Sequence, residues 1–210
     1  MIHIFIADDH EVVREGLKRI LSEYPDLKVV GEAPDARSLM TQIWTSTADV
    51  LLLDITMPGP GFLDLLARLS ARRPSLRTLI LSVHPEEHFA VRALKAGAAG
   101  YVMKDHSSDE LAEAIRRVHS GGRFVSPALA EKLVLELQPG GEKAPHERLT
   151  DREYQILCKL GSGKSVKQIA EELSLSPKTV STYRTRIIEK SGLKTNADMI
   201  RYVIENQLVG

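Results

Sequence analysis

The sequence predicts an α/β protein whose first part is a five-stranded parallel sheet, followed by a small all-α domain. From residue 1 to about 120, apolar runs of strand length alternate with stretches of helical periodicity. Such alternation is typical of a parallel sheet that helices cover on both faces. After Gly121 and Gly122 the alternation stops, and the later apolar positions recur at helical spacing only.

The five expected strands are Ile2–Ala7, Leu27–Ala33, Asp49–Leu53, Leu76–Leu81 and Ala99–Met103. Helices are expected between them at about residues 10–23, 35–46, from 62 onward, 85–96 and from 107 onward. The second helix is expected to bury Leu39, Ile43 and Trp44 on one face. The fifth opens with Ser107-Ser108-Asp109-Glu110, a capping box.

Beyond the sheet, the chain divides into a linker and a helical domain. Pro127–Leu137 has the pattern of a short amphipathic helix, and Gln138–Arg148 mixes proline and glycine with charges, which predicts a flexible tether. Helices are then expected at about 151–160, 166–173, from 177 onward, and at 197–207. We therefore expect one domain over residues 1–120, a linker over 121–148 with a helix at about 127–137, and a second domain over 149–210.

Composition narrows the class of protein. Hydrophobic residues make up 43% of the 210 residues and charged residues 27%, which suits a globular chain with real cores. The longest apolar stretches are strand-sized, and the chain starts without the pattern of a signal peptide, so we expect a cytoplasmic protein that makes no membrane contact. Cys158 is the only cysteine and lies in an apolar helical pattern, so we expect a buried thiol.

The overall charge of zero conceals an asymmetry between the two parts. Residues 1–120 carry 14 basic and 17 acidic residues, a net charge of −3, whereas residues 149–210 carry 10 and 7, a net charge of +3. An acidic N-terminal part and a basic C-terminal part indicate separate partners. Nucleic acid is the candidate partner of the C-terminal domain.

Polar residues follow the expected strands at the points where these end. They are Asp8, Asp9, Asp54, Ser82 and Lys104. Because ligands bind at the carboxyl ends of parallel strands, all five are expected to share one pocket. Like charges ~5 Å apart cost about 3 kcal/mol per pair, so a divalent cation such as Mg²⁺ is a natural addition. Asp54 stands alone at its strand end, which makes it the best candidate for a phosphoryl acceptor.

Four motifs carry a resemblance to a known family: Ala7-Asp8-Asp9-His10, Leu53-Asp54-Ile55-Thr56-Met57-Pro58-Gly59, Leu81-Ser82 and Gly100-Tyr101-Val102-Met103-Lys104-Asp105. In order and spacing they are similar to the receiver domain of two-component response regulators, over residues 1 to about 120. The resemblance implies a flavodoxin-like fold in which Asp54 accepts a phosphoryl group from a sensor histidine kinase.

The same resemblance implies roles for the other residues of the pocket. A Mg²⁺ ion would be held by Asp8, Asp9, Asp54 and the backbone carbonyl of Thr56. Contact with the phosphoryl group and the switch would involve Ser82, Tyr101 and Lys104. The chain departs from the family at Pro60 and at Phe62, where such receivers usually carry glycine. Phe62 starts an apolar stripe, so we expect it to begin the buried face of the third helix.

In the C-terminal domain, two short helices joined by a tight turn predict a helix-turn-helix, whose second helix enters the major groove of DNA. Ser176 and Pro177 fit the first positions of that helix, and its buried stripe is expected at Val180, Tyr183 and Ile187. The expected base-facing residues are Lys178, Ser181, Thr182 and Thr185. The expected phosphate contacts are Lys167, Arg184, Arg186 and Lys194.

This segment resembles a second family. Leu149-Thr150-Asp151-Arg152-Glu153, Lys167-Gln168-Ile169-Ala170 and Ser176–Tyr183 are similar to the LuxR-type four-helix DNA-binding domain, over residues 149–208. A receiver joined to this domain is the NarL/FixJ arrangement. It implies a bacterial transcription regulator that binds an inverted-repeat operator as a homodimer when phosphorylated, with RNA polymerase as a further candidate partner.

Other interpretations remain open from the residues alone. Acids after strands can be ordinary helix caps, and the polar helix face can be a solvated surface of a protein-binding bundle. An aspartyl-phosphate phosphatase of the haloacid dehalogenase type would need an acid two residues after the nucleophile, where this chain has Thr56. A receiver that regulates without phosphorylation is a further alternative. We expect a regulator and not an enzyme.

Overall fold

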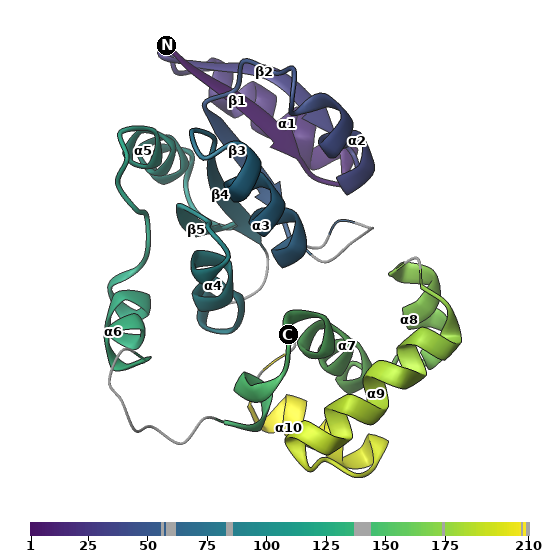
Figure 1. Ribbon diagram of the computed structural model, residues 1–210. Helices are drawn as coiled ribbons and strands as arrows, with labels where there is room; N and C mark the ends of the chain where they lie inside the picture. The colour runs from purple at the N-terminus through teal and green to yellow at the C-terminus, as the bar shows by residue number, and fades with distance from the viewer. Residues whose placement is uncertain are drawn as a thin grey trace. The chain divides into compact units, whose positions relative to one another are not determined.

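The computed structural model describes residues 1–55, 57, 62–82, 86–136, 144–173, 175–206 and 208. The chain forms two compact units, Met1–Leu135 and Glu136–Gly210, and each is described by itself (Figure 1). In the part of the chain that the structure describes, no helix combines the length and the apolarity needed to cross a bilayer.

The first unit contains a five-stranded parallel sheet, as the sequence predicted. Its strands are β1 Ile2–Ala7, β2 Leu27–Ala33, β3 Val50–Asp54, β4 Arg77–Ser82 and β5 Gly100–Met103. The strand order is β2-β1-β3-β4-β5, so the chain reverses its direction of travel across the sheet between β1 and β3. Each neighbouring pair is parallel, which brings the carboxyl ends of all strands to one edge.

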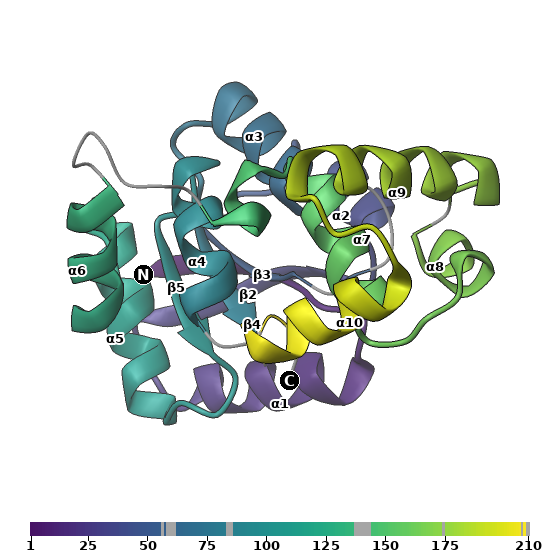
Figure 2. The ribbon, with the colours of Figure 1, turned by 90° about the horizontal axis from the view of Figure 1, so that it is seen from below.

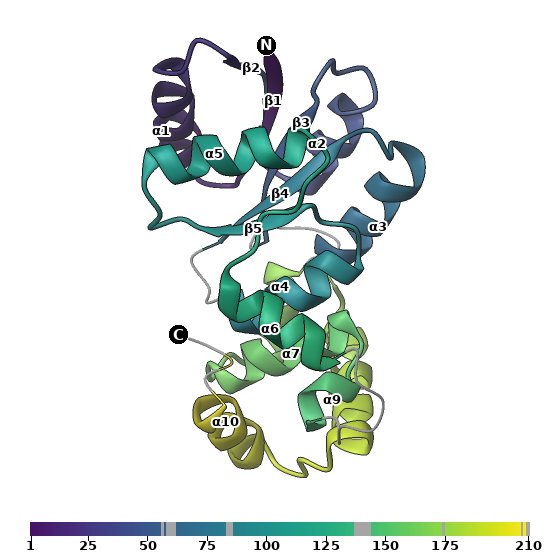
Figure 3. The ribbon, with the colours of Figure 1, turned by 90° about the vertical axis from the view of Figure 1, so that its left-hand side faces the viewer.

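Helices cover both faces of this sheet. They are α1 Glu11–Ser22, α2 Ala36–Gln42, α3 Phe62–Arg72, α4 Glu86–Lys95 and α5 Ser108–His119, with α6 Pro127–Glu136 after them. Figure 2 shows α1 and α5 on one face and α2 and α3 on the other, and Figure 3 shows the same layers from the side. Because the central strands are covered twice, Leu51, Leu52 and Leu53 are fully buried.

One expectation for the second helix is wrong. α2 ends at Gln42, four residues before the predicted end, and only Ile43 of the two following apolar residues is buried. Trp44 is 36% exposed, and the guanidinium of Arg72 lies 5.8 Å from its ring centroid. A cation–π contact with a neighbouring helix thus stabilises the ring at the surface, where helical periodicity predicted burial.

The described residues of the second unit form helices joined by turns and loops, without a strand. Its helices are the short 3₁₀ helix η1 Pro145–Arg148, then α7 Asp151–Gly161, α8 Val166–Glu172, α9 Pro177–Ser191 and α10 Asn196–Glu205. Ile156, Leu157 and Cys158 of α7 are buried, which confirms the expected buried thiol. α7 and α10 approach so closely that a Cβ at Gly161 would lie 2.5 Å from Val203, so this helix crossing requires glycine.

The last residues of Gln138–Arg148, which the sequence predicted to be a flexible tether, are ordered in a short helix. Residues 137–143 lie outside the described part, but Pro145–Arg148 form η1, and His146 Nδ1 lies 2.8 Å from the Tyr202 hydroxyl of α10. The His146 ring also lies 6.0 Å from the ring of Tyr154. Proline and charges indicated an irregular chain, whereas contacts of His146 with Tyr154 of α7 and with Tyr202 of α10 hold it in place.

A buried ion pair joins α7 to α9 and leads to a prediction about acid stability. Glu153 is 1% exposed, accepts the Thr150 N–H at 2.8 Å and lies 2.7 Å from Lys190 Nζ. Burial raises the pKa of Glu153, but the hydrogen bonds from Lys190 and Thr150 outweigh burial, so its pKa lies below the ordinary value. The pair therefore stabilises the second unit at any pH above the pKa that Glu153 has in the unfolded chain. This contribution is lost as the pH falls through the lower pKa that Glu153 has in the folded protein.

Glu153→Gln is accordingly expected to lower the free energy of unfolding by about 1–3 kcal/mol at neutral pH and much less in acid. Urea unfolding of the parent and the variant at neutral and at acidic pH, followed by circular dichroism, measures the difference in stability. Glu205→Gln, at an exposed site of α10, is the control and should behave as the parent does. An equal loss of stability at both pH values would contradict the prediction.

Candidate functional site: an acidic pocket and a recognition helix

Three of the predicted pocket residues lie buried where strands end. Asp8 follows β1, Asp54 ends β3 and Ser82 ends β4, and these residues are 1%, 2% and 0% exposed. The parallel strands bring them to the same edge of the sheet because their registers are aligned, with Asp54 opposite Leu81 and Ser82 opposite Met103. Thr56, the fourth predicted metal ligand, lies outside the described residues.

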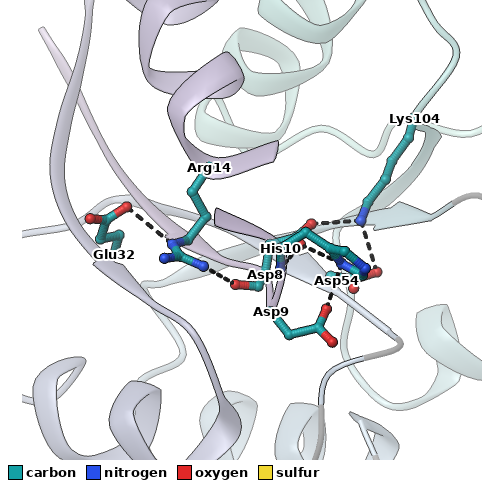
Figure 4. A network of polar contacts seen from close by, with 7 residues as sticks. All are labelled: Asp8, Asp9, His10, Arg14, Glu32, Asp54 and Lys104. Atoms are coloured by element: carbon teal, nitrogen blue, oxygen red, sulfur yellow. Dashed lines mark hydrogen bonds and ion pairs between the residues drawn. The ribbon is translucent and has the colours of Figure 1, made fainter. Parts of the chain in front are cut away.

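Lys104 joins the acids of two different strands (Figure 4). Its Nζ lies 2.6 Å from Asp8 Oδ2 and 3.4 Å from Asp54 Oδ1, and its backbone N–H donates to the Ser82 carbonyl at 2.8 Å. The side chain is 16% exposed, so the ammonium acts in a poorly solvated place. One cation thus offsets part of the charge of the buried acids.

A histidine completes the cluster. His10 donates its backbone N–H to Asp8 Oδ1 at 2.8 Å, and its Nδ1 lies 2.8 Å from Asp9 Oδ1. One oxygen each of Asp8, Asp9 and Asp54 and one nitrogen of His10 all lie within 4.8 Å of one another. This donor set fits a divalent cation, because hard carboxylate oxygens are what Mg²⁺ prefers and the excess negative charge favours an ion there.

Sequence reasoning missed the residues that hold the loop after β1. Arg14 of α1 donates from Nη1 to the Asp8 carbonyl at 2.9 Å, and its Nε lies 3.2 Å from Glu32 Oε2 on β2. Only 12% of the Arg14 side chain is exposed. The helical pattern placed Arg14 on α1, but no local signal could pair it with a strand eighteen residues away.

The sequence singled out three other residues of the first unit, namely Tyr101, Phe62 and Pro60. Tyr101 is 2% exposed in β5, on which α4 packs. Phe62 begins α3 and is buried, which confirms the expectation; its ring meets Phe89 of α4 edge to face at 6.1 Å. Pro60 lies outside the described residues.

In the second unit, α9 begins at the residues that the sequence predicted. Ser176 caps its start by accepting the Thr179 N–H at 3.0 Å, and Pro177 occupies the first turn. Gly192 ends it with a φ of +76°, a conformation that favours glycine. Val180 and Ile187 are fully buried as predicted, whereas Tyr183 is only half-buried.

The opposite face of α9 is exposed and polar. It carries all four predicted base-facing residues, Lys178, Ser181, Thr182 and Thr185. The three hydroxyls donate to backbone carbonyls four residues earlier, at 3.0 Å for Ser181 and Thr182 and 3.2 Å for Thr185. Side chains this short allow close approach of the helix to a groove.

The predicted phosphate contacts surround this face. Lys167 of α8, Arg186 of α9 and Lys194 before α10 are exposed. Arg184 is half-buried, and its Nε donates to Asn196 Oδ1 at 3.0 Å. Asn196 was not predicted from the sequence, since it orients Arg184 from the first turn of the next helix.

Comparison with known proteins agrees with both halves of the site. Residues 4–116 match the model of the response regulator receiver domain, and residues 147–203 match that of the luxR family of bacterial regulatory proteins. The response regulator UvrY of Escherichia coli K12 is 35% identical over 99% of this chain and 96% of the relative. The response regulator GacA of Pseudomonas aeruginosa is 35% identical over 100% and 98%.

Solved structures give the same result. RcsB of Salmonella enterica serovar Typhimurium, bound to the promoter P1flhDC in the presence of the phosphomimetic BeF₃⁻, matches with a TM-score of 0.70 and 25% identity, over 96% of this chain and 98% of that one. These relatives are regulators and not enzymes. The chain is therefore a two-component response regulator of the NarL/FixJ family, a transcription factor with a receiver and a LuxR-type DNA-binding domain.

Proposed function

We propose that Asp54 accepts a phosphoryl group from the phosphohistidine of a sensor kinase, and that this modification controls the binding of DNA by α9. The observation that carries the proposal is the placement of Lys104, whose ammonium lies within 3.4 Å of buried carboxylates on both β1 and β3. A carboxylate beside a fixed cation in a poorly solvated pocket is suited to attack a phosphoryl group, because charge developing on that group is stabilised.

Each residue of the pocket has a proposed task. Asp8, Asp9, Asp54 and the Thr56 carbonyl would hold Mg²⁺, which when bound neutralises charge on phosphoryl oxygens. Lys104 would contact the transferred group, and its present bond to Asp8 keeps the ammonium in place. The Ser82 hydroxyl, at the end of the neighbouring strand, would turn toward the phosphoryl group. Tyr101, buried one strand further, would change its rotamer with that motion.

For the second unit we propose a DNA-binding mode. Lys178, Ser181, Thr182 and Thr185 would face base edges, while the basic residues at Lys167, Arg184, Arg186 and Lys194 would contact phosphates. One such helix reads only a few base pairs, so a homodimer on an inverted repeat with half-sites about one helical turn apart would supply the affinity. The protein would act in the bacterial cytoplasm, where its DNA is, with RNA polymerase as a further partner.

Selection of DNA from a random library by the full chain tests this function. The protein is treated with acetyl phosphate and Mg²⁺, or with Mg²⁺ alone, at fixed salt, because binding to phosphates is strongly salt-dependent. We expect enriched inverted repeats and tighter binding after phosphorylation, together with a shift from monomer to dimer in sedimentation. The absence of sequence enrichment, or equal affinity in both states, would overturn the proposal.

Ser82→Ala distinguishes a residue that senses the phosphoryl group from the residue that accepts it. Ser82 is fully buried and its carbonyl, which the substitution keeps, accepts the Lys104 N–H, so the variant should fold and incorporate phosphate as the parent does. The gain in DNA affinity on phosphorylation should fall several-fold, because the hydroxyl that senses the group is gone. Affinity titrations before and after labelling measure the gain; an undiminished gain would remove Ser82 from the switch.

A further inference from the structure

His10 is placed as a member of the metal site, although the sequence singled out only the acids around it. Its Nδ1 lies 2.8 Å from Asp9 Oδ1 and 3.4 Å from Asp8 Oδ1, and Figure 4 shows the ring beside Asp54. The side chain is 64% exposed, so no packing of apolar neighbours explains why it faces the carboxylates. His106, the other described histidine near these strand ends, instead lies 3.1 Å from Glu110 of its own helix.

The distances from His10 to its two acidic neighbours are those of adjacent ligands around one ion. Bonds of about 2.1 Å, as Mg²⁺–oxygen and metal–imidazole bonds are, place adjacent ligands ~3 Å apart and opposite ones ~4.2 Å apart. The distances from His10 Nδ1, 2.8 Å to Asp9 Oδ1 and 3.4 Å to Asp8 Oδ1, are close to the ~3 Å between adjacent ligands. All four donor atoms lie within 4.8 Å of one another, a limit slightly above the ~4.2 Å between opposite ligands, so a small inward shift of the side chains would be needed to bind one ion.

The backbone around His10 is fixed in the position that this arrangement needs. The residue is the N-cap of α1, its own N–H donates to Asp8 Oδ1, and its carbonyl accepts the N–H of Arg14 at 3.1 Å. Arg14 in turn binds the Asp8 carbonyl. The histidine and the acid pair are thus parts of one short loop held from two sides, so that an ion meets a donor set that is already assembled.

We propose that the His10 imidazole is a direct nitrogen ligand of the ion in this pocket, which gives the receiver a preference for first-row transition ions over Mg²⁺. Imidazole binds Mn²⁺, Co²⁺, Ni²⁺ and Zn²⁺ well, whereas Mg²⁺ favours oxygen ligands alone. The proposal rests on the metal site of the proposed function and adds a ligand and a selectivity to it. The same pocket would accept Mg²⁺ through its carboxylates and bind Mn²⁺ more tightly through His10.

Pulsed electron paramagnetic resonance of the full chain loaded with Mn²⁺ tests the nitrogen ligand directly. The parent should show hyperfine coupling from a coordinated imidazole nitrogen, and excess Mg²⁺ should displace this signal. His10→Ala should lose the coupling, and His106→Ala, the matched control, should keep it. Circular dichroism verifies that both variants are folded.

Affinities measured on the same proteins give the second readout. Loss of a ligand should weaken Mn²⁺ binding by about tenfold or more, since loss of a residue that merely orients a ligand costs 10–100-fold. The Mg²⁺ affinity of His10→Ala should fall less than the Mn²⁺ affinity, so that the ratio of the two affinities drops. No nitrogen coupling in the parent, or coupling that persists in His10→Ala, would overturn the proposal. Failure of Mg²⁺ itself to bind, or of acetyl phosphate to label the parent, would instead overturn the proposed function.

Discussion

Asp54→Asn is expected to abolish phosphoryl labelling completely while the receiver stays folded. The carboxylate of Asp54 is buried 3.4 Å from the Lys104 ammonium, and it shares its pocket with two other acids. The amide has the same shape but cannot form the acyl phosphate. Removing one charge also relieves repulsion of about 3 kcal/mol per pair at this spacing, so the variant should unfold at a higher denaturant concentration than the parent.

Intact-mass measurement after incubation with acetyl phosphate and Mg²⁺ checks this result, and urea unfolding checks the stability. Asp105→Asn is the control, because Asp105 is exposed directly beyond Lys104 and should leave labelling unchanged. A label that persists in Asp54→Asn would move the acceptor to another residue. An unlabelled parent would overturn the proposed role of Asp54 as the acceptor.

Thr182→Glu is expected to abolish specific DNA binding, with a loss of about 100-fold or more. Thr182 lies exposed near the middle of the face that Lys178, Ser181 and Thr185 share. A carboxylate there would be brought close to base edges and phosphates without a compensating partner, and one wrong contact to a base costs about 1–3 kcal/mol before repulsion by the phosphates is added. Because the position is exposed, the second unit should stay folded.

Thr182→Val distinguishes the effect of adding a charge from the effect of losing the hydroxyl. Valine keeps the shape and one methyl in place, so its effect should be limited to a few-fold loss. Fluorescence titration of both variants against the operator selected by the parent, at fixed salt, gives the two affinities, and circular dichroism verifies folding. If Thr182→Glu bound that operator as well as the parent does, α9 would not be the helix that enters the groove.

The sheet and the recognition helix could be predicted from the sequence because their signals are local. Apolar runs such as residues 50–53 of β3 are continuous because helices cover them on both faces, and polar residues such as Asp54 mark where they end. The cap at Ser176 and the proline after it identify the start of α9 within a single stretch of chain. In each case neighbouring residues carry the information.

What the sequence could not predict depends on partners far along the chain. Trp44 was expected in the core because helical periodicity cannot foresee that an arginine of α3 meets its ring. Arg14 and Glu32 lie on different elements, and Asn196 reaches Arg184 from the next helix. His10 could be seen in the motif, but its orientation toward the acids follows from the fixed turn after β1.

The three hydroxyls of α9 carry a consequence for the DNA sequences that this helix can read. Ser181, Thr182 and Thr185 each donate their proton to a carbonyl of their own helix, so what they turn outward are oxygen lone pairs. In the major groove, lone pairs are complementary to amino groups, which adenine and cytosine present and which guanine and thymine lack there. Each half-site should therefore be read through exocyclic amines, and replacing such an adenine by purine, which lacks the amine, should weaken binding at those positions alone.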